Sequence, residues 1–319
     1  EFENNIPIAT YLYNNAIKNY LEYRGKIVLY FKDTKTILIS QLFLNRLNEQ
    51  SKANINEFKL PNPIKHVEKK PFVIESKSKI DKIGLKHPAP YSYIDIEELT
   101  KIESINNKII LDPFLGVGST IIGTYKNNKN IGIELNPKYI DLIKERFNFL
   151  NINEAFQDSQ IICGDSLMEV DKIKTKFDDV ITSPPYFNIL KNNTSGVRTD
   201  NSQSRQGIEY YSDLSNDIGN LETLNEYSNI MQNLFAKIYN KISENGKIYL
   251  VVSDFTVDKK EQDIHSMFLK VMNEAGFTYR TTSYILQNQK VIYPFGYPYK
   301  IVINHIFQYI MIFEKNEQE

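Results

Sequence analysis

Strand-length apolar runs alternate with amphipathic, helix-length segments from about residue 86 to the end of the chain. Strands separated by helices form βαβ units, so this alternation predicts an α/β domain built on a doubly wound, mostly parallel sheet. The last two apolar runs have no helix between them, which predicts an antiparallel hairpin at one edge of the sheet. Strands are expected at residues 108–112, 130–134, 160–163, 177–182, 246–253, 279–286 and 302–313, and helices at residues 137–150, 223–243 and 263–275 and from Ser119 onward.

Two stretches depart from this alternation. Residues 6–48 hold short helix-like and strand-like segments, the latter near residues 26–31 and 36–44, which predict a small N-terminal α+β appendage. Proline and lysine then become frequent over residues 60–71, and such a change marks a domain boundary. Residues 187–222 are polar and aperiodic, and a loop of this length inside a compact domain is usually functional or disordered. The expected division is therefore an appendage with a basic linker at residues 1–83 and a main domain at residues 84–319.

Composition narrows the class of protein. Of the 319 residues, 41% are hydrophobic and 24% are charged, which is ordinary for a globular protein and excludes wholesale disorder. The sequence has no apolar run of the length of a membrane span and no charged-then-apolar leader, so neither a membrane anchor nor a secretory signal is expected. The single cysteine, Cys163, excludes an intrachain disulfide and a cysteine-based zinc site and indicates a reducing, cytoplasmic location. We expect Cys163 to be a buried apolar residue, and the four scattered histidines indicate no metal site.

The overall charge does not indicate a polycation. The net charge is 38 − 39 = −1, so attraction to nucleic acid would require local segregation of charge. Residues 51–90 hold nine lysines and four acids, a surplus of five positive charges. This surplus fits two interpretations, a solvated linker or a segment that attracts a phosphate backbone without sequence preference.

A glycine-containing loop follows the first strand of the predicted sheet. The sequence Asp112-Pro-Phe-Leu-Gly-Val-Gly-Ser-Thr120 opens a helix, and Gly116 and Gly118 permit a tight turn and a close approach of the backbone to a ligand. Glu134 ends the next strand, where an acid commonly accepts hydrogen bonds from ribose hydroxyls. Asp165 follows the third strand, where it is expected to accept a bond from an adenine amino group. Together these strand ends predict a nucleoside pocket.

The loop also narrows the identity of the nucleoside. A dinucleotide fingerprint would place a small residue where this chain has Ile121, and the sequence has no Gly-Lys-Ser/Thr for a phosphate. Asp112 and Phe114 instead offer a carboxylate and an apolar ring, which suit a cationic ligand without phosphate. The cofactor expected is therefore S-adenosylmethionine, which combines adenine, ribose and a sulfonium.

A second motif, Ser183-Pro-Pro-Tyr186, closes the fourth strand. One interpretation is purely structural, because proline ends a strand and a tyrosine can fill a core. The other is catalytic: the Ser183 hydroxyl and the Pro184 carbonyl can accept the two hydrogens of an exocyclic amine and draw its nitrogen towards tetrahedral geometry. Pro184 and Pro185 fix φ and have no competing N–H. Tyr186 offers a flat surface to a base that has left its stack.

The two motifs resemble the cofactor and catalytic motifs of the amino-group DNA methyltransferases, which modify cytosine N4 or adenine N6. The segment Lys86-His-Pro-Ala-Pro-Tyr91 resembles the part of that family that closes over the methionine end of the cofactor, and residues 304–315 resemble its final strand. The resemblance covers residues 84–315 and leaves residues 1–83 outside. It implies a Rossmann-like methyltransferase fold. It also implies cofactor contacts from His87, Pro88, Asp112, Phe114, Gly116, Gly118, Ser119, Thr120, Glu134 and Asp165, and a catalytic role for Ser183, Pro184, Pro185 and Tyr186.

The resemblance further implies a site-specific DNA methyltransferase that flips its target base. The Ser form of the tetrapeptide is associated more often with cytosine N4, so cytosine N4 is the expected target. A restriction–modification system is the expected context, with a restriction endonuclease or a specificity subunit as partner. Three alternatives stay open: adenine N6 methylation, methylation of an RNA base, and a catalytically silent nucleic-acid-binding subunit. Methylation at ring carbon C5 is excluded, because it needs a cysteine beside the base.

No separate target-reading domain fits between the motifs, since only sixteen residues separate Asp165 from Thr182. Target reading is therefore expected from residues 187–222, from residues 1–83, from a second subunit or from a part of the protein outside this sequence. Residues 187–222 contain side chains of the types that read base edges, namely Asn192, Asn193, Gln203 and Arg205.

Overall fold

The structure is a computed structural model that divides the chain into two compact units, residues 1–71 with 288–304 and residues 72–287 with 305–319. The division at residue 83 expected from the sequence stays a prediction for the chain as a whole. The structure describes residues 29–31, 36–38, 73–75, 80–87, 91–187, 214, 216–257, 260–286 and 307–316.

The first unit contributes one described feature, a short antiparallel hairpin. Strands β1 (Leu29–Phe31) and β2 (Thr36–Leu38) pair with Leu29 opposite Leu38. Both lie within the segments in which the sequence predicts strands. The helices expected in the appendage and the five lysines from Lys52 to Lys70 lie outside the described residues.

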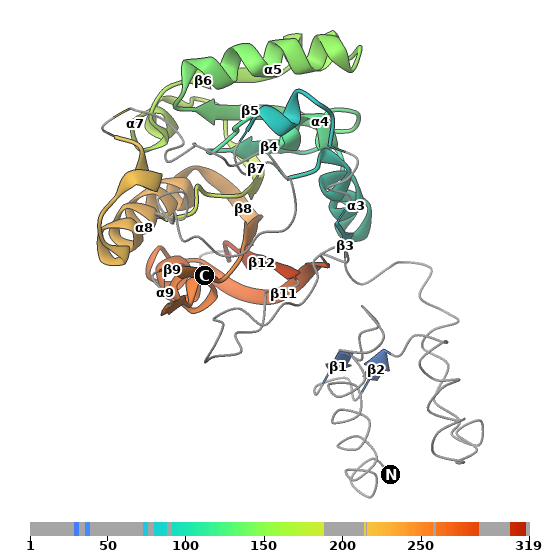
Figure 1. The fold of residues 1–319 in the computed structure, drawn as a ribbon. Helices are drawn as coiled ribbons and strands as arrows, with labels where there is room; N and C mark the ends of the chain where they lie inside the picture. The colour runs from blue at the N-terminus through green and yellow to red at the C-terminus, as the bar shows by residue number, and fades with distance from the viewer. Residues whose placement is uncertain are drawn as a thin grey trace, which may run out of the picture. The chain divides into compact units, whose positions relative to one another are not determined.

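An eight-stranded sheet forms the centre of the second unit, in the order β3-β11-β12-β8-β7-β4-β5-β6 (Figure 1). Strands β4 to β8 are parallel to their sheet neighbours within that group, whereas β12 is antiparallel to both β8 and β11. The predicted α/β fold with a mostly parallel sheet and an antiparallel hairpin is therefore confirmed. The strands are β3 (Val73–Ile74), β4 (Ile109–Asp112), β5 (Lys129–Glu134), β6 (Gln160–Cys163), β7 (Phe177–Thr182), β8 (Ile242–Val252), β11 (Thr278–Leu286) and β12 (Phe307–Glu314).

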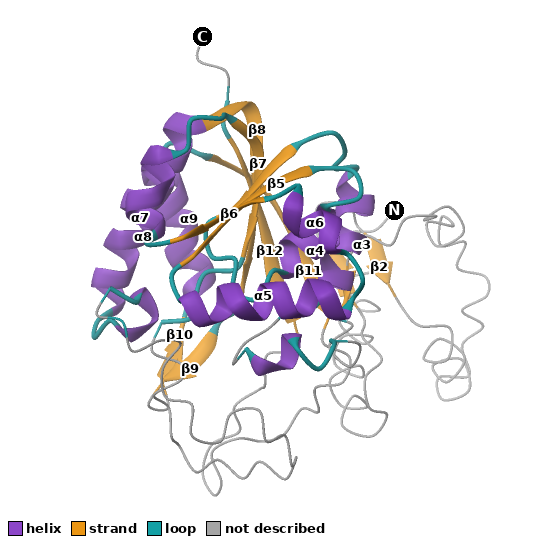
Figure 2. Ribbon diagram, turned by 90° about the horizontal axis from the view of Figure 1, so that it is seen from above, coloured by secondary structure: helices purple, strands orange, loops and turns teal. Residues whose placement is uncertain are grey.

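Helices cover both faces of this sheet, as Figure 2 shows. Buried apolar residues of α8 and α9 pack on one face, and those of α3, α4 and α5 pack on the other. The helices are α3 (Tyr93–Glu103), α4 (Ser119–Thr124), α5 (Pro137–Phe149), α6 (Asn153–Gln157), α7 (Ser166–Glu169), α8 (Leu224–Lys241) and α9 (Ile264–Glu274). Shorter elements are the 3₁₀ turns η4 (Gly84–Lys86), η5 (Val170–Lys172) and η7 (Ile218–Asn220) and the hairpin of β9 (Phe255–Val257) and β10 (Lys260–Gln262).

The strand order locates the functional edge of the sheet. The chain proceeds outward from β4 through β5 to β6 and then returns to β7, which pairs with β4 on its other side. In open α/β sheets, ligands bind outside the carboxyl ends of the strands at such a reversal. The carboxyl ends of β4 and β7 carry the two motifs singled out in the sequence.

Candidate functional site

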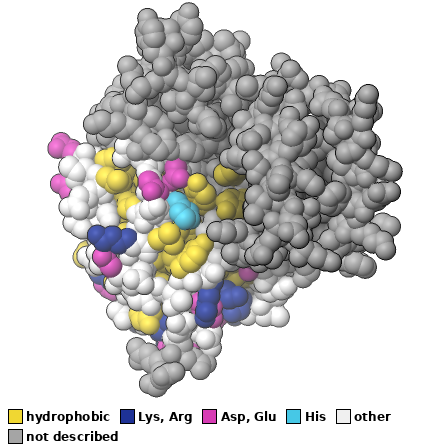
Figure 3. All heavy atoms as spheres, turned by 90° about the horizontal axis from the view of Figure 1, so that it is seen from below, with side chains coloured by type: hydrophobic (Ala, Val, Ile, Leu, Met, Phe, Trp, Pro, Cys, Tyr) yellow, Lys and Arg dark blue, Asp and Glu magenta, His cyan; other side chains and the backbone are white. Residues whose placement is uncertain are grey.

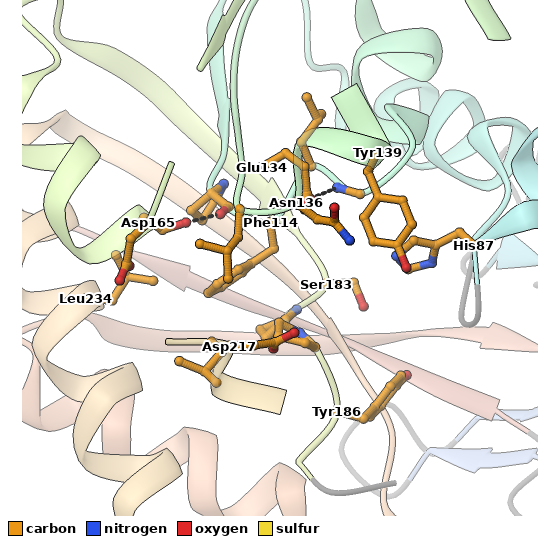
Figure 4. A pocket seen from close by; sticks show the side chains of 18 of the residues that line it. His87, Phe114, Glu134, Asn136, Tyr139, Asp165, Ser183, Tyr186, Asp217 and Leu234 are labelled. Carbon is orange, nitrogen blue, oxygen red and sulfur yellow. Dashed lines mark hydrogen bonds between the residues drawn. The ribbon is translucent and has the colours of Figure 1, made fainter. Parts of the chain in front are cut away.

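A pocket enclosing about 970 Å³, part of it open to solvent, lies at this carboxyl edge. Every parallel strand from β4 to β7 contributes to its lining through the residues that follow it. Other parts of the chain complete the wall, among them His87, the residues around Asp217, Tyr139 of α5 and Leu234 of α8 (Figure 4). Segments far apart in the sequence therefore form one continuous cavity.

The loop after β4 makes the tight turn that its glycines predict. Gly116 has a φ of 55° and Gly118 a φ of 82°, conformations that favour glycine over other residues. A Cβ on Gly116 would lie 3.4 Å from His87 Nε2, and a Cβ on Gly118 would lie 3.1 Å from the Phe147 ring. At Gly118 a side chain would therefore crowd the Phe147 ring, whereas at Gly116 the positive φ is the main reason for glycine.

Asp112 lies behind this loop rather than in the pocket. Its side chain is buried, and Oδ1 accepts hydrogen bonds from the Phe114 N–H at 3.0 Å and the Thr182 hydroxyl at 2.7 Å. Oδ2 accepts bonds from the hydroxyls of Thr120 and Tyr91. Burial raises the pKa of the Asp112 carboxyl. Asp112 thus joins β4 to β7 and α4, and it does not present its carboxylate to a ligand as the sequence led us to expect.

Glu134 ends β5 and faces the pocket with a nearly buried carboxylate. Its Oε2 accepts the Gly116 N–H at 2.7 Å, and its Oε1 accepts the Asn136 N–H at 2.8 Å. Burial raises its pKa to about 7, although the two backbone donors oppose that rise. Each carboxylate oxygen has a second lone pair, so Glu134 can accept further hydroxyl donors while it fixes the glycine loop.

Asp165 caps α7 and also lines the pocket. Its Oδ1 accepts the Leu167 N–H at 2.9 Å, and its Oδ2 accepts the Asn216 side-chain amide at 3.1 Å. The neighbouring Ser166 hydroxyl donates to the Pro113 carbonyl, which ties this strand end to the glycine loop. Figure 4 places Asp165 and Glu134 on the same pocket wall as Phe114.

Ser183, Pro184, Pro185 and Tyr186 extend from the end of β7 into the same pocket. The Pro185 carbonyl accepts the Tyr227 hydroxyl at 3.0 Å, so it is already engaged. Within the described part of the chain, no hydrogen bond reaches the Ser183 hydroxyl or the Pro184 carbonyl. Tyr186 accepts a bond from the Gln308 amide at 3.0 Å and packs edge-to-face on Phe255. This corner therefore offers two acceptors and an oriented ring.

The structure brings together most of the residues predicted from the sequence. The tetrapeptide and six predicted cofactor residues line one pocket, namely His87, Phe114, Gly116, Ser119, Glu134 and Asp165. Asp112, Gly118 and Thr120 lie outside the lining and support the loop. Pro88 lies outside the described residues. Cys163 is exposed rather than buried, because β6 is the outermost strand of the sheet and Cys163 lies at its end; that expectation was wrong.

Several lining residues carry no signal in the sequence. Tyr139, on α5, packs its ring 4.7 Å from that of His87, and Figure 4 shows the two rings side by side. Asp217 caps η7 through a 2.9 Å bond to the Gly219 N–H and is 6% exposed. The positions of Tyr139 and Asp217 depend on how α5 and the long connection before α8 pack against the sheet. Only the polar character of residues 187–222 hinted at a role.

The lining fits S-adenosylmethionine. Three carboxylates line the pocket, those of Glu134, Asp165 and Asp217, whereas no lysine or arginine of the described residues does so. Such a site accepts hydroxyl, amino and cationic groups and disfavours phosphates. The apolar lining, which includes Phe114 and Leu234, can cover an adenine ring.

One face of the molecule carries hydrophobic side chains gathered around a histidine, with acidic side chains next to them (Figure 3). In the part of this face that the structure describes, the basic side chains lie apart from one another. The described residues include neither a group of side chains able to hold a metal ion nor a helix whose length and hydrophobicity suit a membrane span.

Comparison with known proteins finds one family model that matches part of the chain. The family model described as DNA methylase, that of the N6/N4 methylases, matches residues 3–145. This match begins far upstream of residue 84, where the motif resemblance starts, and it ends before Ser183. The matched region therefore includes residues that the motif resemblance leaves outside, and it does not reach the tetrapeptide.

Two curated relatives match shorter stretches. The orphan methyltransferase M.BamHII of Bacillus amyloliquefaciens is 32% identical over 83 residues, which are 25% of this chain and 31% of that protein. A protein of Methanocaldococcus jannaschii assigned as an N5-glutamine methyltransferase is 30% identical over 112 residues, 34% of this chain and 53% of that protein. The chain thus spans about a third and about half of the lengths of these relatives. Among solved structures, TrmN of Thermus thermophilus aligns with a TM-score of 0.44 and 11% identity over 73% of this chain and 51% of that chain.

Proposed function

We propose that the chain is a member of the N6/N4 DNA methylase family, whose model matches residues 3–145, and that it uses S-adenosylmethionine to methylate the exocyclic amine of a flipped DNA base, cytosine N4 in particular. One observation carries the proposal. The residues suited to a nucleoside cofactor and the tetrapeptide suited to an amine line the same pocket. A methyl donor and an acceptor held in one cavity need only be brought into line, and positioning of this kind lowers a barrier substantially.

The cofactor would lie along the loops after β4, β5 and β6. Glu134 would accept the ribose hydroxyls and Asp165 the adenine amino group, while Phe114 covers the base. His87 and the Gly116 backbone would border the amino-acid part. When bound, S-adenosylmethionine supplies a methyl group on a positively charged sulfur. The three carboxylates of the lining favour that charge.

The target amine would enter at the end of β7. The Ser183 hydroxyl and the Pro184 carbonyl accept its two hydrogens, which directs the nitrogen lone pair towards the donor side of the pocket. Methylation would also require the amine to lose one proton, which could pass to solvent through the open part of the pocket. Tyr186 holds the base by stacking, since its ring is oriented by Gln308 and Phe255.

We propose cytosine N4 rather than adenine N6 as the target for one reason. The tetrapeptide begins with serine, and the serine form resembles the cytosine-N4 members of the family more than the adenine-N6 members. A restriction–modification role, with a nuclease or specificity subunit as partner, follows from the same resemblance. The cytoplasm is the expected location.

A second candidate substrate is the side-chain amide of a protein glutamine. The observation that favours it is the 30% identity to the protein assigned as an N5-glutamine methyltransferase over 53% of that protein's length. A glutamine amide resembles a cytosine amine in the one respect that matters here, because its nitrogen lone pair is also delocalised. The same two acceptors would activate it.

Product analysis tests the proposal. The protein is incubated with labelled S-adenosylmethionine and, in separate reactions, with mixed DNA, RNA and a protein extract, and each product is digested to nucleosides or amino acids. We expect N4-methylcytosine in the DNA reaction. N6-methyladenine would correct the base, a methylated ribonucleoside or N5-methylglutamine would correct the substrate class, and absence of labelled product with intact cofactor binding would indicate a silent subunit. Ser183→Ala serves as the control, because it removes one of the two groups that would accept hydrogen bonds from the target amine.

A further inference from the structure

A buried ion pair lies beneath the segment that carries His87 into the pocket. Arg146, on α5, is fully buried, and its Nε donates to Asp81 Oδ2 at 2.9 Å. The Asp81 side chain is 6% exposed. Neither residue lines the pocket. Burying two charges costs free energy even when they pair, so a pair of this kind stabilises little by itself and is better explained by the geometry it imposes.

Arg146 joins two further parts of the fold. Its Nη1 donates at 2.9 Å to the Val117 carbonyl in the glycine loop and at 2.9 Å to the Ser119 hydroxyl at the start of α4. The Ser119 hydroxyl donates in turn to the Tyr91 carbonyl at 2.8 Å. The planar fork of the guanidinium can make these contacts together, whereas a lysine could not. Arg146 thus connects α5, the glycine loop and the 80–87 segment.

Asp81 directs the course of that segment. Its Oδ1 accepts the N–H groups of Ile83 at 3.1 Å and Gly84 at 2.8 Å, which begins η4. The turn ends where the His87 N–H donates to the Gly84 carbonyl at 3.2 Å. A Cβ on Gly84 would lie 2.9 Å from Arg146 Nη2, so the turn packs directly against the guanidinium. One carboxylate therefore both starts the turn and fixes it to α5.

We propose that Asp81 and Arg146 are positioning residues that act on cofactor binding through His87. Their ion pair holds η4 against α5 and the glycine loop, and this places the His87 ring beside Tyr139 and over Gly116. The inference rests on the proposed function in one respect, that the pocket binds S-adenosylmethionine. The Lys86–Glu145 ion pair, with an N–O distance of 2.9 Å, also joins the 80–87 segment to α5. Both side chains are 48% exposed, and ion pairs as exposed as this contribute little to stability.

The test is a double-mutant cycle read by calorimetric affinity for S-adenosylmethionine. Asp81→Asn keeps an oxygen for the turn and removes the charge, and we expect affinity about tenfold weaker, equivalent to about 1.4 kcal/mol. His87→Ala should weaken binding similarly. The double variant should bind nearly as well as His87→Ala alone, because Asp81 acts through that ring. Glu145→Gln is the matched control and should bind within about twofold of wild type.

A second readout is independent of the cofactor. Hydrogen exchange at the amides of Ile83 and Gly84 should accelerate in Asp81→Asn, because the turn loses the ion pair that holds it against α5, and should stay unchanged in Glu145→Gln. Additive losses in the cycle, or faster exchange with unchanged affinity, would overturn the inference. If Asp81→Asn does not fold, Arg146→Lys, which keeps the charge but loses the fork, takes its place in the same cycle. Failure of the wild-type protein to bind the cofactor at all would count against the proposed function instead.

Discussion

A change at Tyr186 should distinguish binding of the target base from binding of the cofactor, the two roles proposed for the pocket. Its ring packs on Phe255, and its hydroxyl accepts a bond from Gln308 on β12, away from the loops that would hold the cofactor. We expect Tyr186→Ala to raise the KM for DNA about tenfold or more, because stacking of a base on an aromatic ring is worth about 1–3 kcal/mol. Calorimetric affinity for S-adenosylmethionine should stay within about twofold of wild type.

Tyr186→Phe is the matched control for this change. It keeps the stacking surface and removes the hydroxyl that accepts the bond from Gln308, so most of the DNA affinity should persist. If Tyr186→Ala weakened cofactor and DNA binding equally, the tetrapeptide would be a structural corner and not the binding site of a base.

Glu134 makes cofactor binding depend on pH. Burial raises its pKa from 4.5 to about 7. The ionised form accepts ribose hydroxyls best, so we expect affinity for S-adenosylmethionine to fall as the pH is lowered through about 7. The free protein should respond in the opposite sense. A carboxyl whose pKa is raised in the folded state contributes stability that is lost as the pH rises between 4.5 and about 7.

Calorimetric titrations between pH 6 and pH 8 check the first expectation, and thermal unfolding without ligand checks the second. Glu134→Gln should bind more weakly at pH 8 and should flatten both profiles, because its amide does not titrate. An unchanged slope in this variant would assign the pH dependence to another group.

At the scale of elements, the sequence predicted the elements that have strong local signals. Helix α5 begins with an Asn136 cap and Pro137, and α8 begins with a capping box of Thr223 and Glu226, so both starts can be read from the chain. Helix α3 was missed. Of its apolar residues, only Ile96 and Leu99 are buried, which gives too short an amphipathic pattern to detect.

Pairing between distant elements was harder to predict than the elements themselves. Strand β3 has two residues and exists only because β11 offers its edge. The same limit applied to the site. The glycine loop and the tetrapeptide could be recognised from their residue types alone. Tyr139 and Asp217 could not, because they reach the pocket only when α5 docks on the sheet and the chain returns before α8. Asp112 was misplaced for a similar reason, since its partner Thr182 lies on another strand.

At the scale of the whole molecule, the distribution of charged residues determines which part of the chain could attract DNA. The chain carries a net charge of −1, and three acids line the pocket. On the face that Figure 3 shows, the basic side chains of the described residues do not form one patch. A basic segment elsewhere in the chain is therefore a candidate for attracting the phosphate backbone. The lysine surplus over residues 51–90 is the strongest candidate in the sequence.

Replacing five of these lysines with glutamine tests that assignment, the set being Lys52, Lys59, Lys65, Lys69 and Lys70. Each lysine that neutralises a phosphate adds about 0.9 to the slope of log affinity against log salt concentration. We therefore expect the variant to bind DNA more weakly at low salt and with a shallower slope in fluorescence anisotropy. A control triple variant replaces Lys101, Lys144 and Lys270, each of which pairs with a nearby acid on its own helix. That control should leave the slope unchanged. If the five-lysine variant also kept the wild-type slope, these residues would be a solvated linker, and the phosphate contacts would have to come from another segment or a second subunit.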